Sequence, residues 1–174
     1  MESKTDEFQE ESLKAMDYLI ETSKKVLAKI KNLGVRVQPV HLDLHPHNTL
    51  FEGNELKAIL DYDGCCVSEL IREVGFILHR AVRQYVVNQG IPHSDRERIK
   101  REIKNGREVF FEAYEKINPL TPKEKSLLPF FIQDECLHKV HSLLNKHYLG
   151  AGTPWIKELP KQIILLKEGE YFYD

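Results

Sequence analysis

Cysteine is scarce in this chain of 174 residues, and its placement argues against a disulfide framework. The cysteines are Cys65, Cys66 and Cys136, so two are adjacent and no C-x-x-C pair occurs. An odd number of cysteines with this spacing is typical of an intracellular protein whose thiols stay reduced. We therefore expect reduced, partly buried thiols and no disulfide bond.

Long apolar runs and a strong charge of one sign are also missing. No stretch approaches 18 consecutive apolar residues, and the charged N-terminus does not resemble a signal peptide. The formal net charge of −2 and the pI of about 6.5 argue against nucleic acid or a membrane surface as a partner. With 41% hydrophobic residues, the composition favours a single domain over residues 1–174 and a cytoplasmic location.

Glycine-rich phosphate loops are absent from the sequence as well. Neither G-x-G-x-x-G nor G-x-x-x-x-G-K-[ST] occurs, and the residues before His41 hold a single glycine, Gly34. Apolar residues in that region recur mostly at intervals of three and four, which predicts one long helix with Gly34 as a natural stop. The residues expected to face the core are Phe8, Leu13, Met16, Ile20, Leu27 and Ile30.

The most informative segment is residues 41–63, with the sequence HLDLHPHNTLFEGNELKAILDYD. Two short apolar runs flank Gly53-Asn54, a pair that favours a two-residue turn between antiparallel strands. The segment therefore predicts a β-hairpin in which Glu52 faces Glu55 across the turn.

Such a hairpin would bring oxygen-bearing side chains together. Counting back from the turn, Asn48 faces Ile59, so Asp61 returns to the end of the hairpin where Asn48 lies. Asp43 stands five residues before Asn48. Amide and carboxylate oxygens are hard ligands that suit Mg²⁺, whose remaining positions are filled by waters and substrate phosphates. We expect Asn48 and Asp61 to share one Mg²⁺.

This segment resembles the catalytic segment of the aminoglycoside phosphotransferase and choline kinase family, a branch of the protein-kinase-like fold. The family pattern is H-G-D-x-H-x-x-N, then a hairpin, then a D-F-D or D-F-G-like triplet. The matching residues here are His41, Asp43, His45 and Asn48, followed by Asp61-Tyr62-Asp63.

The resemblance implies a role for each matched residue. His41 and Asp43 would be catalytic, with Asp43 orienting or accepting the proton of an acceptor hydroxyl. Asn48 and Asp61 would bind the metal and the nucleotide phosphates. His45 and Asp63 would support the site, His45 by bracing the loop.

Three positions depart from the family pattern. Leu42 and His47 stand where the family usually has glycine, so the loop backbone is expected to differ there. Glu73 replaces the usual aspartate of a D-L-A-like element that hydrogen-bonds the catalytic loop. Glu73 is expected either to be buried against residues 41–45 or to be an ordinary acidic residue in the first turn of a helix.

The resemblance implies a mainly α fold with a small β-hairpin, equivalent to the C-terminal lobe of a kinase-like enzyme. The reaction would transfer the γ-phosphoryl group of ATP or GTP, with Mg²⁺, to a hydroxyl of a small molecule. The nucleotide-binding lobe would come from a longer chain or a second chain, and activity without it would be weak. A non-catalytic binding module is the alternative. Apolar surface left by the missing lobe would favour a homodimer.

A transition-metal site is a further alternative for the same segment. His41, Asp43, His45 and His47 alternate, and in an extended strand they would share one face. Imidazole and carboxylate ligands suit zinc or iron. Pro46 and the lack of a second His/Asp cluster weaken this hypothesis.

The remaining chain is expected to be helical. Helix starts are predicted at Ser68, at Ser94 with Glu97 as a capping box, and at Thr121 with Glu124 as a second capping box. Gly90 should end the first of these helices. A last short helix is expected over residues 155–167.

Charged residues on these helices have two interpretations. The basic stretch 96–107 contains interleaved glutamates, so it is expected to be a solvated helix face rather than a phosphate site. Asp134 and Glu135 are expected to be solvated or to pair with Lys139 and His138. Otherwise, one of the two acids would attract a cationic acceptor.

Overall fold

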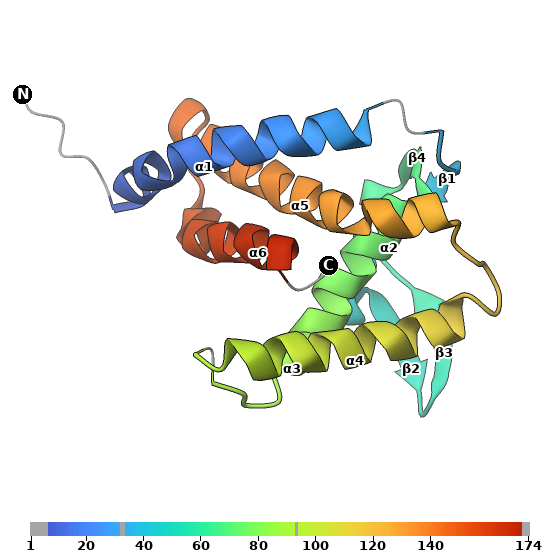
Figure 1. The fold of residues 1–174 in the computed structure, drawn as a ribbon. Helices are drawn as coiled ribbons and strands as arrows, with labels where there is room; N and C mark the ends of the chain where they lie inside the picture. The colour runs from blue at the N-terminus through green and yellow to red at the C-terminus, as the bar shows by residue number, and fades with distance from the viewer. Residues whose placement is uncertain (1–6, 32–33, 93, 172–174) are drawn as a thin grey trace, which may run out of the picture.

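The computed structural model describes residues 7–31, 34–92 and 94–171 (Figure 1). The fold is mainly α, as expected, with two small antiparallel sheets. Within the described residues, no helix combines the length and apolar character needed to cross a membrane. The elements are α1 (Glu7–Ile30), β1 (Val37–Val40), β2 (Thr49–Glu52), β3 (Glu55–Ile59), β4 (Cys66–Glu69), α2 (Leu70–Ile77), α3 (Arg83–Val87), α4 (Arg96–Tyr114), α5 (Pro122–Leu144) and α6 (Leu159–Tyr171).

The predicted hairpin is present as β2 and β3, and Glu52 pairs with Glu55 as expected. A bulge between Leu50 and Phe51 shifts the register beyond that point. Thr49 therefore pairs with Ile59, and the expected pairing of Asn48 with Ile59 is wrong by one residue. The second sheet joins β1 to β4 and connects the segment before the hairpin to the segment after it.

Helix α5 lies at the centre of the core and packs against α1, α2 and α6 (Figure 1). Its Phe131 and Ile132 belong to a buried apolar cluster with α2 and α4, while Cys136 and Val140 belong to a second cluster with α1 and α6. Gly75 of α2 allows the two helices to approach closely, because a Cβ there would lie 3.3 Å from Ile132. The shared helix fixes α2, which follows the predicted catalytic segment, against the rest of the molecule.

One predicted helix start is confirmed and two are shifted. Thr121 and Glu124 form the expected capping box at the start of α5. Helix α4 is capped by Asp95, whose side chain accepts a hydrogen bond from the Arg98 backbone N–H, and not by Ser94. Ser68 is also not a cap, because it lies in β4 and pairs there with β1. The strand pairing delays the start of α2 until Leu70.

The predicted core face of α1 is wrong at four of its six residues, while Phe8 and Ile30 pack against the buried core as expected. Leu13 and Leu27 are 60% and 58% exposed, and Met16 and Ile20 are exposed as well. The buried residues of α1 lie on another face and include small polar side chains; they are Ser12, Leu19, Thr22 and Val26. Small residues let α1 approach α5 and α6 closely, so this face packs against them and the larger apolar face does not. The exposed stripe is the apolar surface a homodimer would need, and the oligomeric state stays a prediction.

All three cysteines are free, as expected, but only one is buried. Cys65 and Cys66 are exposed, whereas Cys136 is buried in the core. Burial raises the pKa of the Cys136 thiol to about 12, so it stays protonated at neutral pH.

Candidate active site

A buried carboxylate holds the backbone of the predicted catalytic loop. Oε2 of Glu73, on α2, accepts hydrogen bonds from the backbone N–H groups of His41 at 2.5 Å and Leu42 at 2.9 Å. Glu73 is only 9% exposed. The expectation that Glu73 is buried against this loop is therefore confirmed, and the alternative of an ordinary first-turn acid is wrong.

His41 connects the loop to the hairpin. Its Nδ1 lies 3.3 Å from the Asp43 backbone N–H, which donates to it. Its Nε2 lies 2.9 Å from the carbonyl oxygen of Leu60, which can only accept, so Nε2 is the donor in this hydrogen bond. The Tyr62 ring packs on the imidazole, with the ring centroids 5.2 Å apart. His41 thus fixes the backbone of Asp43 rather than offering a free ring nitrogen.

The Asp43 carboxylate is held on one side and open on the other. Nδ2 of Asn48 donates to Asp43 Oδ2 at 3.0 Å and to the Asp43 carbonyl oxygen at 2.9 Å. Nε2 of His45 lies 3.5 Å from the same Oδ2. Asp43 Oδ1 has no hydrogen-bond partner among the described residues, and the side chain is 42% exposed. An incoming hydroxyl can therefore reach Oδ1.

Two residues of this segment have a left-handed backbone. Leu42 has a φ of 58° and Asp61 a φ of 61°. Because a side chain is strained in this region, glycine is the residue that fits best at position 42. Leu42 therefore adopts a backbone conformation that a glycine would adopt without strain.

Asn48 and Asp61 offer free oxygens at the same end of the hairpin. The Leu60 N–H donates to the Asn48 carbonyl oxygen at 2.9 Å, so Asp61 follows directly after the residue that pairs with Asn48. The Asn48 amide group faces Asp43, which leaves Oδ1 as its remaining ligand atom. Asp61 is exposed and forms no hydrogen bond or ion pair with any described residue. These two oxygen donors fit Mg²⁺ by their chemistry, and shared binding stays a prediction.

The other predicted members of the site differ in their surroundings. Asp63 lies in an exposed turn, Tyr62–Gly64, and contacts no partner among the described residues. The transition-metal hypothesis for His41, Asp43, His45 and His47 finds no support, since no group of three such ligands gathers anywhere in residues 7–31, 34–92 and 94–171. The physical reason is the turn at Pro46–Asn48, which breaks the extended backbone that would align them.

Comparison with known proteins agrees with this geometry. The sequence model of a family described as the phosphotransferase enzyme family matches residues 2–114 of the chain. This range includes the whole segment from His41 to Glu73 and ends with α4. The chain belongs to the phosphotransferase enzyme family. A search among curated proteins gave no match.

The chain contains a structural anchor, the ion pair of Arg36 with Glu124, that the sequence did not predict. Arg36, just before β1, donates from Nε and Nη2 to both carboxylate oxygens of Glu124, at 2.9 and 2.8 Å. The Arg36 guanidinium also donates to Asn118 and to the carbonyl oxygen of Pro119. These bonds tie the strand leading into the catalytic loop to the start of α5. The capping box reveals Glu124, but nothing local marks Arg36 as its partner.

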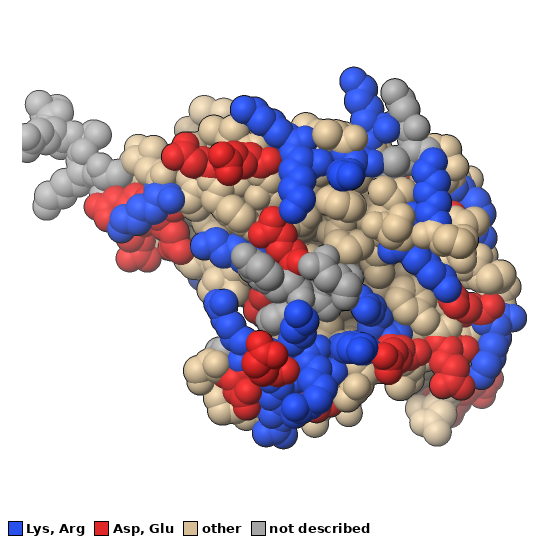
Figure 2. Space-filling model, in the orientation of Figure 1, with Lys and Arg blue, Asp and Glu red and all other residues tan. Residues whose placement is uncertain are grey.

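The charged side chains of the later helices are mostly paired. Asp134 forms an ion pair with Arg72 of α2, and Glu135 pairs with Lys139 at 3.2 Å. The pairing of Glu135 was expected, while that of Asp134 with Arg72 was not. The basic residues of stretch 96–107 lie over the N-terminal part of α4, among acidic ones, as expected for a solvated face (Figure 2).

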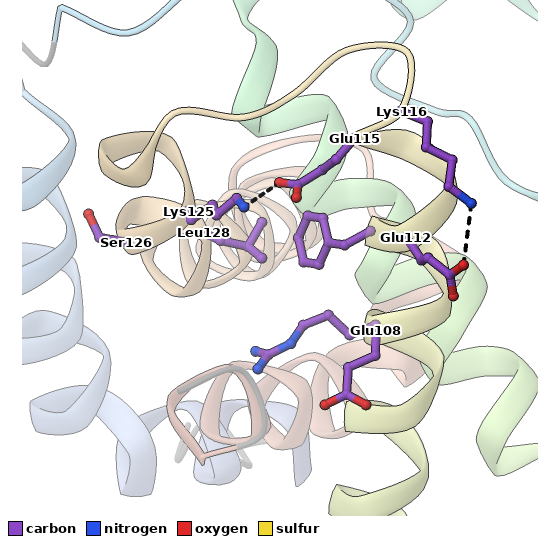
Figure 3. A pocket seen from close by; sticks show the side chains of 9 residues that line it. Glu108, Glu112, Glu115, Lys116, Lys125, Ser126 and Leu128 are labelled. Carbon is purple, nitrogen blue, oxygen red and sulfur yellow. Dashed lines mark hydrogen bonds and ion pairs between the residues drawn. The ribbon is translucent and has the colours of Figure 1, made fainter.

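A large open pocket of about 820 Å³ lies between α4 and α5 (Figure 3). Charged side chains at its rim pair with one another: Lys125 forms an ion pair with Glu115, and Lys116 forms one with Glu112. Phe111 and Leu128 line its floor. No residue of the catalytic segment 41–63 contributes to this pocket, so its size does not make it the active site of the phosphotransferase.

Proposed function

We propose that this chain is the catalytic-loop lobe of a kinase that transfers the γ-phosphoryl group of ATP or GTP to a hydroxyl of a small molecule. One observation carries the proposal. The Asp43 carboxylate is fixed at Oδ2 by Asn48 and left open at Oδ1, in a loop whose backbone is held by buried Glu73. The free oxygen lies on the exposed side of Asp43, where an acceptor hydroxyl can approach it.

Asp43 has the position that phosphoryl transfer requires. The acceptor hydroxyl would donate its hydrogen bond to Oδ1, and Asp43 would orient the oxygen lone pair and take the proton as the new P–O bond forms. The bond between the γ-phosphorus and the β,γ-bridging oxygen would break at the same time, and ADP or GDP would leave. His41 holds the Asp43 backbone and Asn48 holds its carboxylate, so the reacting oxygen is positioned before the acceptor arrives. Positioning of this kind supplies most of the catalysis in phosphoryl transfer.

Asn48 Oδ1 and the Asp61 carboxylate are the atoms that would hold Mg²⁺. Held there, Mg²⁺ would supply positive charge that neutralises the negative charge of the nucleotide phosphates. The proposal also includes a second lobe that covers the phosphates, supplied by a longer chain or a separate one. It is supported by the lack of any glycine-rich phosphate loop in the sequence. Without that lobe, nucleotide affinity should be weak and turnover low.

The proposal is tested by measuring Mg²⁺–ATP binding calorimetrically for the chain and for two matched variants. Asp61→Asn should weaken binding by about tenfold or more, since even the loss of an outer-shell partner of a metal typically costs 10–100-fold in affinity. Asp17→Asn makes the same charge change at an exposed position of α1, outside the segment 41–63, and should bind like the parent.

Asp43→Asn separates binding from chemistry. It should leave Mg²⁺–ATP affinity nearly unchanged and abolish any phosphate transfer to small alcohols. Equal binding by Asp61→Asn and Asp17→Asn would reject the metal assignment and favour a non-catalytic module. Strong phosphorylation by the chain alone, lost in Asp43→Asn, would show that its own residues cover the phosphates.

A further inference from the structure

A second, smaller pocket borders the catalytic loop. Its volume is about 240 Å³, below the range of about 300–1,000 Å³ typical of drug-sized ligands, so it suits a single functional group. It lies between the end of α2, α3, α6 and the turn that carries His47. No aspartate or glutamate is among its lining residues, whose polar members include His47, His79, Arg80, Arg83, Gln84 and Lys161.

Two of the lining side chains have buried nitrogens without partners. His79 is 4% exposed, and its Nδ1 has no hydrogen-bond partner among the described residues. The Nε of Arg80 is also buried and has no hydrogen-bond partner among the described residues. Arg80 forms no ion pair with any described residue. Buried polar atoms are nearly always paired, so two unpaired ones beside the same pocket indicate a missing acceptor. Both residues lie in a π-helical segment, Leu78–Val82, and such segments are frequent at functional sites.

The protonation of His79 makes it a donor toward an anion. Burial, together with the nearby charges of Arg83, Lys139, Arg80 and Lys161, lowers the pKa of His79 to about 3, so the ring is neutral at pH 7. Its Nε2 lies 3.7 Å from the Cys136 thiol, which stays protonated and can donate to it. A ring that accepts at Nε2 carries its own proton on Nδ1.

The positive charge of the pocket is only partly compensated. Arg83 pairs with Glu168, and Lys161 pairs with Glu158 at 3.2 Å. Arg80 has no such carboxylate within the part of the chain that the structure describes. The pocket therefore has an uncompensated guanidinium and an N–H donor, which favour an anion and disfavour a cationic group.

The side chain of His45 lies between Asp43 and His47, which lines this pocket. His47 forms part of its wall, and the His47 and His45 rings have centroids 5.5 Å apart. His45 Nε2 in turn lies 3.5 Å from Asp43 Oδ2. We propose that this pocket binds an anionic group, a carboxylate or a phosphate, of the hydroxyl compound that Asp43 receives. The identity of that compound as the acceptor rests on the proposed function, whereas the anion site itself does not.

The anion site is tested by NMR titration of the full chain, with histidine side chains labelled by ¹⁵N. Inorganic phosphate and acetate are the probes, since they carry the two candidate groups without a hydroxyl-bearing scaffold. Both should shift the His79 ring signals in a saturable way. Arg80→Met should weaken this binding by about tenfold or more, because a charged hydrogen-bond donor is lost.

Arg98→Met is the matched control, because Arg98 is an exposed arginine on α4, outside the pocket. It should bind both anions like the parent. Arg80→Met should also melt close to the parent, since Arg80 forms no ion pair with a described residue and Met can still pack on the Phe76 ring, which lies 6.0 Å from the guanidinium. The absence of a saturable His79 shift, or equal binding by the Arg80 and Arg98 variants, would overturn the anion site.

Asp43→Asn distinguishes failure of this inference from failure of the proposed function. Anion binding should persist in that variant, because Asp43 does not line the pocket. Competition then tests the source of the anion. A hydroxy acid that displaces phosphate better than acetate does would support an acceptor subsite, and displacement by ATP alone would contradict it.

Discussion

Two buried carboxylates, Glu73 and Glu124, hold the segment around β1, and they do so in different ways. Glu124 receives hydrogen bonds on both oxygens, from the Arg36 guanidinium and from the Thr121 backbone N–H. Glu73 receives two backbone N–H bonds on Oε2 alone, and its Oε1 is buried without a partner. Glu124 has a compensating cation, and Glu73 has none among the described residues.

The difference shows that the two carboxylates have different roles. Glu124 anchors one element to another, whereas Glu73 sets the backbone path of a loop. A fully satisfied ion pair fixes two elements at little cost in unmet hydrogen bonds, and it can lie far from any chemistry. A carboxylate that binds only backbone N–H groups sets the path of the chain and leaves the side chains of the loop free. Glu73 therefore allows His41 and Asp43 to face the site, while Glu124 keeps the whole segment in place.

The largest effect is expected at the structural anchor. Arg36→Ala should lower the free energy of unfolding by about 3 kcal/mol, because it leaves the Glu124 carboxylate buried without its cation. Arg36→Lys should lower it less, since it keeps the charge but loses the two-pronged geometry. Chemical denaturation at pH 7 measures both, with Arg98→Ala as an exposed control that should stay within about 0.5 kcal/mol. A small loss in Arg36→Ala would show that Glu124 is solvated.

The same anchor should control stability in acid. The hydrogen bond from Arg36 lowers the pKa of Glu124 from 4.5 to about 2. Because the folded pKa is the lower one, this contribution is complete above about pH 4.5 and is lost as the pH falls toward 2. The stability of Arg36→Ala should fall less steeply over this window than that of the parent. Parallel pH profiles of the two proteins would show that other groups dominate acid unfolding.

An intermediate effect is expected at Glu73. Glu73→Ala should cost about 1–3 kcal/mol, because two buried backbone N–H groups lose their acceptor. Glu73→Gln keeps an acceptor oxygen and should cost less. Hydrogen exchange localises the effect, since the amides of His41 and Leu42 should exchange faster in Glu73→Ala than in the parent. Unchanged protection at both amides would mean that the loop keeps its shape without the carboxylate.

Features set by local residue patterns could be predicted from the sequence, whereas features set by tertiary packing could not. The hairpin turn and the capping box at Thr121 were predicted because each depends on a short pattern of residue types with a defined backbone geometry. Glu73 was singled out by the family resemblance, and the sequence left open whether it was buried against the loop or an ordinary first-turn acid. Most of the core face of α1 was predicted wrongly because a helix has several faces, and the elements that pack against it decide which face is buried. Its larger apolar stripe is exposed, while Ser12 and Thr22 are buried.

Contacts between distant residues were not predictable from one sequence. Arg36 and Glu124 are 88 residues apart, and the residues lining the proposed anion pocket come from three separate stretches of the chain. No local pattern encodes such a meeting. The bulge between Leu50 and Phe51 was missed for a different reason, because one inserted residue changes the pairing without changing the apolar alternation that signals a strand.

The smallest effect is expected at Leu42, whose N–H is one of the two that Glu73 accepts. Leu42 has a φ of 58°, a conformation that costs about 1 kcal/mol or more for a residue with a side chain. Leu42→Gly should remove that strain and raise stability by about 0.5 kcal/mol, because the greater flexibility of glycine in the unfolded chain offsets part of the gain. Leu42→Ala keeps the strain and serves as the control for loss of the side chain. If Glu73 rather than residue 42 imposes this backbone shape, the gain from Leu42→Gly should disappear in the Glu73→Ala background, where the loop is free to relax. Chemical denaturation of the four combinations measures this coupling, and equal gains in both backgrounds would show that the left-handed turn is fixed independently of the carboxylate.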